Sequence, residues 1–142
     1  MLLAVAIAGL TLTAANRYWS TLVQREREAE LLYRGDQIRA AIQSYYDNPP
    51  GNQPKSYPRA IKDLVKDPRF PGLKRHLRKA YRDPMNPGAE WGVVRDAKGG
   101  LKGVFSQNTG QPIKQGNFPR NYSGFESAKS YKDWKFVYNP RN

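Results

Sequence analysis

The chain has 142 residues, no cysteine and a formal net charge of +12, and 39% of its residues are hydrophobic. This length suits one domain with a modest core, and the lack of cysteine excludes disulfides, thiolate metal sites and a cysteine nucleophile. The charge indicates either a solvated basic surface or attraction to nucleic acid, anionic lipid or an acidic partner.

Residues 1–18 form the first predicted unit, an apolar half-helix. The first charged residue is Arg17. Fifteen helical residues span about 22 Å, less than the roughly 30 Å of a bilayer core. Three interpretations are therefore open: a cleavable signal peptide, a buried hairpin helix, and a membrane helix with further residues before Met1, which we favour. The nearest basic residues all follow the apolar segment, so a cytoplasmic domain is expected unless a basic leader precedes Met1.

Residues 19–48 are predicted to continue the same helix as its amphipathic half. They are mostly good helix formers and contain no proline, and the Asn-Pro-Pro-Gly-Asn sequence at 48–52 ends the helix. A single helix of about 47 residues would be some 70 Å long. Residues at spacings of three and four predict a stripe that packs on a sheet: Leu31, Gly35, Ile38, Ile42 and Tyr45. Gly35 on this stripe indicates a close approach of the sheet.

Residues 49–90 are predicted to form a helical connecting region with two short helices. The first lies in SYPRAIKDLVKDPRF, and the second starts near Pro71 in PGLKRHLRKAYRDP. We name five basic residues of the second helix the basic patch: Lys74, Arg75, Arg78, Lys79 and Arg82. A solvated helix face is the simplest interpretation of this patch. Contact with an acidic neighbouring subunit and binding of nucleic acid or phosphate are the alternatives.

Residues 91–142 are predicted to form a small antiparallel sheet with a long surface loop. EWGVVRD and GLKGVFSQN flank a turn at 97–100 and predict a hairpin. DWKFVYN alternates aromatic residues with Lys135 and Val137, which predicts a third strand. The segment 107–132 is expected to be an ordered surface loop or the variable contact surface of a filament. The fold class is therefore α+β, with the sheet packed on the long helix.

The residues for catalysis are missing, so we expect no enzyme. His76 is the single histidine, lies among Lys and Arg, and is expected at the surface rather than as a catalytic base. No glycine-rich loop precedes a P-loop lysine. We expect no cofactor.

Five blocks of the chain carry a resemblance to a known family. They are LLAVAIAGLTLTAANRYWSTLVQREREAELLYRGDQIRAAIQSYY, YPRAIKDLVKDPRFPGLKRHLRKAYRDPM, AEWGVV, GVFS and FESAKSYKDWKFVY. In this order they resemble the type IV pilin and type II secretion pseudopilin superfamily, in the branch akin to the major pseudopilin. The resemblance covers nearly the whole chain.

The resemblance implies a pilin-like fold and a life cycle. A prepilin peptidase removes a basic leader and methylates the new N-terminus, and inner-membrane machinery then assembles the subunits. The protein would reside in the bacterial inner membrane and afterwards in a periplasmic or extracellular filament, a pseudopilus or a pilus. The expected contacts in the filament core are Ala4, Val5, Ala6, Ile7, Ala8, Gly9, Leu10 and Leu12.

Two features depart from the family pattern or leave it open. Most pilins carry a glutamate as the fifth mature residue; if Met1 is the first mature residue, that place is Val5, and the first carboxylate of the chain is Glu26. This leaves room for a minor, initiating or specialised subunit. Major pseudopilins also hold calcium near their C-terminal strands. A calcium site in this chain is therefore a further alternative, and its ligands would be oxygens of Asp83, Asn86, Glu90, Asp96 and Asn108.

Two functions from different classes follow. The leading hypothesis is a structural subunit that forms a homo-oligomeric helical filament through its N-terminal helix. The alternative is a membrane-tethered nucleic-acid-binding module that uses the basic patch, for which steep salt dependence is expected.

Overall fold

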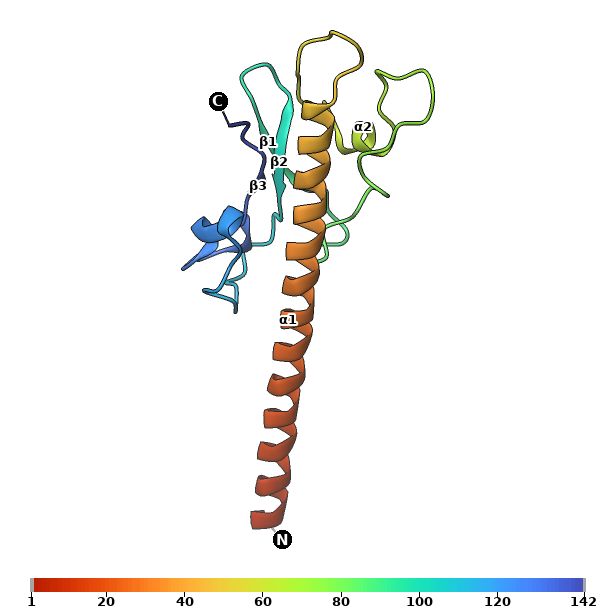
Figure 1. Cartoon of the computed structure of the whole chain (residues 1–142). Coiled ribbons are helices and arrows are strands. Elements are labelled where there is room, and N and C mark those ends of the chain that lie inside the picture. The colour runs from red at the N-terminus through yellow and green to blue at the C-terminus, as the bar shows by residue number, and fades with distance from the viewer. Residues whose placement is uncertain (1, 142) are drawn as a thin grey trace.

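A computed structural model describes the backbone of residues 2–141 and the side chains of residues 14–141. One long helix runs the length of the molecule, and the other elements gather around its C-terminal half (Figure 1). The layout is α+β, a long N-terminal helix packed on a small antiparallel sheet. In chain order the elements are α1 (Leu2–Asp47), α2 (Ile61–Val65), β1 (Gly92–Arg95), β2 (Leu101–Phe105), the 3₁₀ helices η1 (Arg120–Phe125) and η2 (Tyr131–Asp133), and β3 (Phe136–Val137).

Helix α1 is continuous over 46 residues and ends at Asp47, immediately before the Asn-Pro-Pro sequence. Proline lacks the backbone N–H that a further turn would need. The prediction of one unbroken helix is therefore confirmed for residues 2–47. Side chains from Ala14 to Thr21 are all exposed, and Glu28 is the first buried one among those described. Within the described part of the chain, no helix has both the length and the apolar character that crossing a bilayer requires.

The three strands form one antiparallel sheet in the order β1-β2-β3. Val93 pairs with Val104, and Gly103 pairs with Val137. The turn between β1 and β2 is held by the Asp96 carboxylate, which accepts hydrogen bonds from the N–H groups of Lys98 at 3.1 Å and Gly100 at 2.6 Å. The predicted hairpin and third strand are confirmed, although β3 has only two residues.

The sheet packs on the stripe that the sequence predicts on α1. Leu31, Ile38 and Ile42 are fully buried. A Cβ atom at Gly35 would overlap the ring of Phe136, so glycine at this position lets β3 approach the helix closely. All five residues of the predicted stripe are buried, but Tyr45 packs against His76 and Arg69 of the loop after α2.

The second short helix predicted after Pro71 is wrong, because residues 71–82 form a loop. The N–H groups of His76 and Leu77 both donate to the carbonyl of Leu64, at 2.8 and 2.9 Å, which ties the segment to the end of α2. In a helix, the basic patch would also place like charges four residues apart, as at Lys74 and Arg78, and such pairs are destabilising. The connecting region therefore contains only one short helix, α2.

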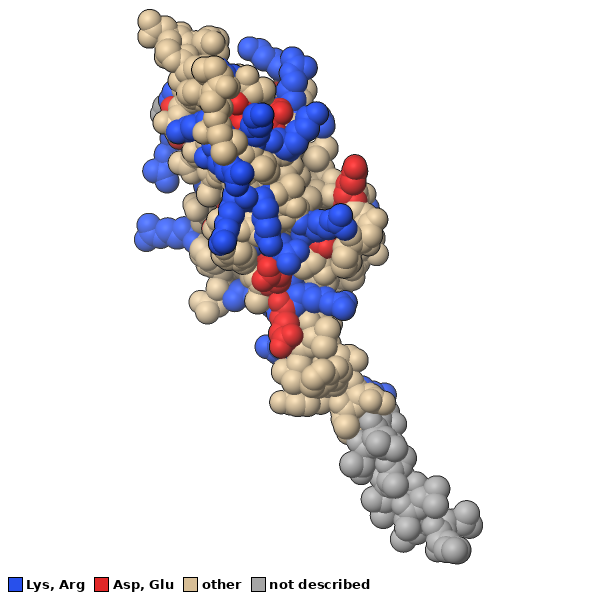
Figure 2. Space-filling model, turned by 90° about the vertical axis from the view of Figure 1, so that its right-hand side faces the viewer, with Lys and Arg blue, Asp and Glu red and all other residues tan. Residues whose placement is uncertain are grey.

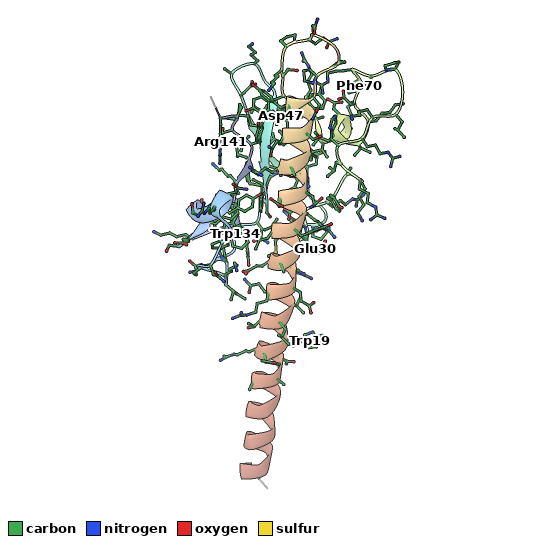
Figure 3. All side chains as sticks on the ribbon, viewed as in Figure 1. Trp19, Glu30, Asp47, Phe70, Trp134 and Arg141 are labelled. Carbon is green, nitrogen blue, oxygen red and sulfur yellow. The ribbon has the colours of Figure 1, made fainter. Side chains whose placement is uncertain are left out.

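The segment 107–132 is ordered, but its inner side forms part of the core. Tyr122, Phe125 and Tyr131 are buried, and the ring of Phe125 stacks on Trp134 with centroids 5.6 Å apart. This aromatic group fills the space between the 3₁₀ helices and β3, and Figure 3 shows Trp134 on that side of α1. Most residues of this segment are at the surface, as expected of an ordered surface loop, and its buried rings also supply core volume that the small sheet lacks.

Candidate functional site

Two surfaces and one buried network are the candidate functional features. The first surface is the part of α1 that stands out from the domain. Tyr18 and Trp19 are each 69% exposed there, and Figure 3 shows Trp19 on the helix well away from the sheet. The predicted filament-core residues lie on helical backbone further towards the N-terminus, and their side chains are outside those described: Ala4, Val5, Ala6, Ile7, Ala8, Gly9, Leu10 and Leu12.

The second surface is the basic patch of Lys74, Arg75, Arg78, Lys79 and Arg82. All five residues are exposed, and Lys and Arg side chains gather on this side of the domain (Figure 2). Among the described residues, none of the five lies within 4.0 Å of a carboxylate, because the ion pairs there involve other cations. One end of the patch is fixed to α1, since the guanidinium of Arg34 donates to the carbonyl of Arg82 at 2.8 Å.

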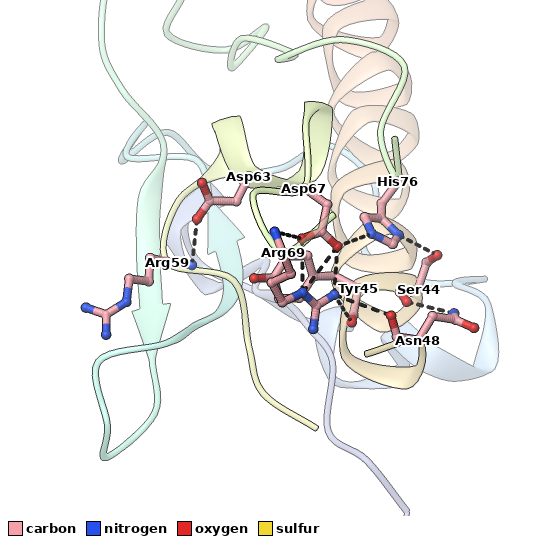
Figure 4. A network of polar contacts seen from close by, with 8 residues as sticks. All are labelled: Ser44, Tyr45, Asn48, Arg59, Asp63, Asp67, Arg69 and His76. Carbon is pink, nitrogen blue, oxygen red and sulfur yellow. Dashed lines mark hydrogen bonds and ion pairs between the residues drawn. The ribbon is translucent and has the colours of Figure 1, made fainter. Parts of the chain in front are cut away.

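A buried polar network holds the other end of the patch (Figure 4). The Asp67 carboxylate accepts hydrogen bonds from Arg69 Nη2 at 2.8 Å and pairs with His76 Nε2 at 2.9 Å. The other ring nitrogen of His76 lies 2.8 Å from Ser44 Oγ on α1, and Arg69 Nη2 donates to the carbonyl of Tyr45 at 2.8 Å. The network therefore ties the loop after α2 to the last turns of α1.

His76 is not at the surface, which corrects the expectation from its charged neighbours. Its side chain is 0% exposed, and its ring packs edge-on against Tyr45 at 5.5 Å between centroids. A polar ring is buried without penalty only when both nitrogens have partners, and Asp67 and Ser44 provide them. Leu77 follows directly and is also buried, so the chain turns inward at this point of the basic segment.

Ser44, His76 and Asp67 are the residue types of a hydrolytic triad, but the geometry supports a structural role. Asp67 is also paired with Arg69, which neutralises the carboxylate that would support a basic imidazole. Neither Ser44 nor His76 lines any of four surface hollows in the described part of the molecule. A nucleophile needs room for a substrate beside it.

The acidity of Asp67 provides a test of this network. Burial raises the pKa of the Asp67 carboxyl, but hydrogen bonds from Arg69 and His76 outweigh burial and lower the pKa from 3.8 to about 2. A carboxyl with a depressed pKa stabilises the fold above its unfolded pKa, and this stabilisation is lost as the pH falls towards the folded pKa. It amounts to about 2 kcal/mol.

We expect the free energy of unfolding of the natural chain to fall by about 2 kcal/mol more between pH 4 and pH 2 than that of the Asp67→Asn variant. Denaturant titrations followed by tryptophan fluorescence at each pH measure this difference. Asp63→Asn is the control and should keep the pH dependence of the natural chain, because the Asp63 carboxylate bonds the N–H of Arg59 and neither Arg69 nor His76. Identical pH profiles for Asp67→Asn and the natural chain would contradict a stabilising Asp67.

Two carboxylates of the calcium alternative, those of Asp83 and Asp96, accept local hydrogen bonds. The Asp83 carboxylate accepts from Ser106 Oγ at 2.6 Å and from the N–H of Met85 at 2.9 Å, and the Asp96 carboxylate holds the hairpin turn. In the described residues no three His, Asp or Glu side chains are arranged to hold a metal ion.

One anchoring residue was missed by the sequence analysis. The Glu28 carboxylate is buried on α1 and accepts hydrogen bonds from the backbone of Ile113 and from Tyr131 Oη, which attaches the long loop to the helix. The signal was present, because position 28 extends the 31-35-38-42-45 stripe by one step. A carboxylate on an apolar stripe indicates a buried partner.

Comparison of the chain with protein-family models, curated proteins and solved structures finds no match in any of the three.

Proposed function

We propose that this chain is the structural subunit of a helical filament, of the type IV pilus or type II secretion pseudopilus kind, and that its partner is a second copy of itself. One observation carries the proposal. Helix α1 is a single continuous helix whose C-terminal half is built into the domain, while its N-terminal part extends beyond the other described elements (Figure 1). The resemblance of the sequence blocks to pilins, and the α+β layout, agree with it.

The projecting helix explains why a filament would form. Its sequence is apolar over the first fifteen residues, and apolar side chains are stable in an apolar environment rather than in water. Lipid supplies that environment before assembly, and neighbouring helices supply it afterwards. Because lipid is as apolar as a neighbouring helix, close packing at small residues must guide association, and the sequence has Ala4, Ala6, Ala8 and Gly9.

The exposed aromatic residues fit the membrane stage of this cycle. Tyr18 and Trp19 follow the apolar segment after only two residues, Asn16 and Arg17, and Trp and Tyr are enriched where a helix leaves the hydrocarbon core. In this proposal the chain resides in the bacterial inner membrane, is processed by a prepilin peptidase, and is moved by the inner-membrane machinery into a periplasmic or extracellular filament.

Electron microscopy of material sheared from producing cells, with mass spectrometry of the N-terminus, tests the proposal. We expect fibres that contain this chain with the segment 1–15 retained and a methylated terminus. Recovery of free monomers alone, or of a mature protein that lacks residues 1–15, would overturn it.

A further inference from the structure

We propose that the basic patch binds the phosphate backbone of double-stranded nucleic acid without reading its sequence. This goes beyond the filament proposal and is tested on the unassembled chain. The first argument is local charge. Residues 55–82 contain ten Lys and Arg and only two acidic residues, Asp63 and Asp67.

Neither acidic residue forms an ion pair with the patch. Asp67 is fully buried and already paired with Arg69 and His76, and the Asp63 carboxylate accepts a hydrogen bond from the N–H of Arg59 at 3.1 Å. Elsewhere in the described chain, the pairs Arg34–Glu30 and Lys55–Asp47 join a cation to a carboxylate, whereas many other exposed cations, such as Lys129 and Lys132, also have no carboxylate within 4.0 Å. The five patch residues have none within 4.0 Å among the described residues, so their charges repel one another and favour an anionic ligand.

The patch is held in place despite this repulsion. His76, within the patch segment, is joined to Ser44, and Arg82 at its end is joined to Arg34. These two contacts are ten residues apart on α1, which is about 15 Å along a helix axis. Each strand of a duplex carries one phosphate per roughly 3.4 Å of axis, so the patch has the length to face about four phosphates of one strand.

The surroundings favour a duplex over an unpaired strand. Recognition of single strands depends on several exposed aromatic rings that stack on bases. Beside the patch Tyr81 is buried, and Tyr33, 52% exposed, packs edge-on against Tyr81 at 6.2 Å between centroids. The patch therefore provides five exposed charges with one exposed ring beside them, which suits phosphate contacts and not base stacking.

The position of the patch disfavours an anionic membrane as its ligand. The apolar segment that would enter lipid ends at residue 15, and the nearer end of the patch is fixed at Arg34. Nineteen helical residues correspond to about 28 Å, which is well beyond the screening length of about 8 Å at physiological salt. A chain inserted upright would hold the patch too far from the headgroups to be attracted.

The test uses the full chain in neutral detergent micelles and a labelled 20-base-pair DNA duplex. Four phosphate contacts predict that the logarithm of the binding constant falls with the logarithm of salt concentration with a slope of about −4. Replacing Lys74, Arg75 and Arg78 together by Gln should weaken binding at least tenfold and reduce that slope by about 3. The matched control replaces Lys129, Lys132 and Lys135 by Gln, which removes the same charge from exposed sites beside η2 and β3, and should change binding less than about twofold.

Equal losses in the two triple variants would show that only net charge matters and would overturn the proposal. Absence of duplex binding by the natural chain at 50 mM salt would also overturn it. The proposal would also be overturned if polyglutamate displaced the labelled duplex as effectively as unlabelled duplex of the same total charge. The patch would then suit an acidic protein. All substituted side chains are exposed, so circular dichroism should show unchanged folding, and the salt slope of the natural chain is an independent measurement.

Discussion

Replacing Ala8 by arginine is expected to abolish filaments while the domain still folds. Ala8 lies in the apolar segment of the sequence and its side chain is outside those described, so the expectation rests on sequence and on the helical backbone there. A charged side chain at the centre of a membrane helix costs about 2.5–3.5 kcal/mol in insertion, and its bulk prevents close approach of neighbouring helices. Gly9→Leu adds only bulk and should also prevent assembly.

The measurement is electron microscopy of sheared material, with tryptophan fluorescence on thermal unfolding to show an intact domain. Trp91 and Trp134 report on that domain because both are buried. Gln43→Arg is the matched control, since it adds the same charge at an exposed position on α1 beside the domain. It should leave filaments unchanged. Normal filaments from both Ala8→Arg and Gly9→Leu would refute assembly through the apolar segment.

The features that could be predicted from the sequence are those with a local pattern. Repeated spacings of three and four residues define the buried face of α1, and the prolines after Asp47 define its end. Alternation of aromatic residues with Lys135 and Val137 in 133–139 predicts the third strand. The Gly-Gly sequence at 99–100 predicts the hairpin turn. Gly35 indicated a close approach because a glycine in a helix interior is costly unless packing requires it, and Phe136 occupies the space beside it.

The features that could not be predicted depend on contacts between distant segments. Burial of His76 requires Ser44, 32 residues away, and Asp67, and no spacing rule joins these three residues. The periodic apolar residues of 73–81 favoured a helix, but pairing of this segment with Leu64 decided its backbone instead. The basic patch was recognised by composition, whereas its exposure and the absence of acidic partners among the described residues are known only from the structure.

Replacing Glu28 by alanine is expected to lower the free energy of unfolding by about 3–5 kcal/mol. The Glu28 side chain is 3% exposed and accepts hydrogen bonds from the N–H groups of Ile113 at 2.5 Å and Lys114 at 3.1 Å and from Tyr131 Oη at 2.6 Å. Burial and the hydrogen bond to Glu28 raise the pKa of Tyr131, so its hydroxyl remains a donor at neutral pH. Truncation leaves these donors without that acceptor, and each buried unsatisfied group costs about 1–3 kcal/mol.

The matched control is Glu30→Ala, which removes the same side chain two positions along the same helix. Glu30 is 45% exposed and pairs with Arg34 at 2.6 Å; an exposed pair of this kind contributes about 0.3–0.5 kcal/mol. Denaturant unfolding compares the two variants, and hydrogen exchange locates the effect, since the amides of Ile113 and Lys114 should exchange faster only in Glu28→Ala. Equal losses of stability in the two variants would contradict the structure, because the attachment of the long loop to α1 depends on the burial of one carboxylate and not of the other.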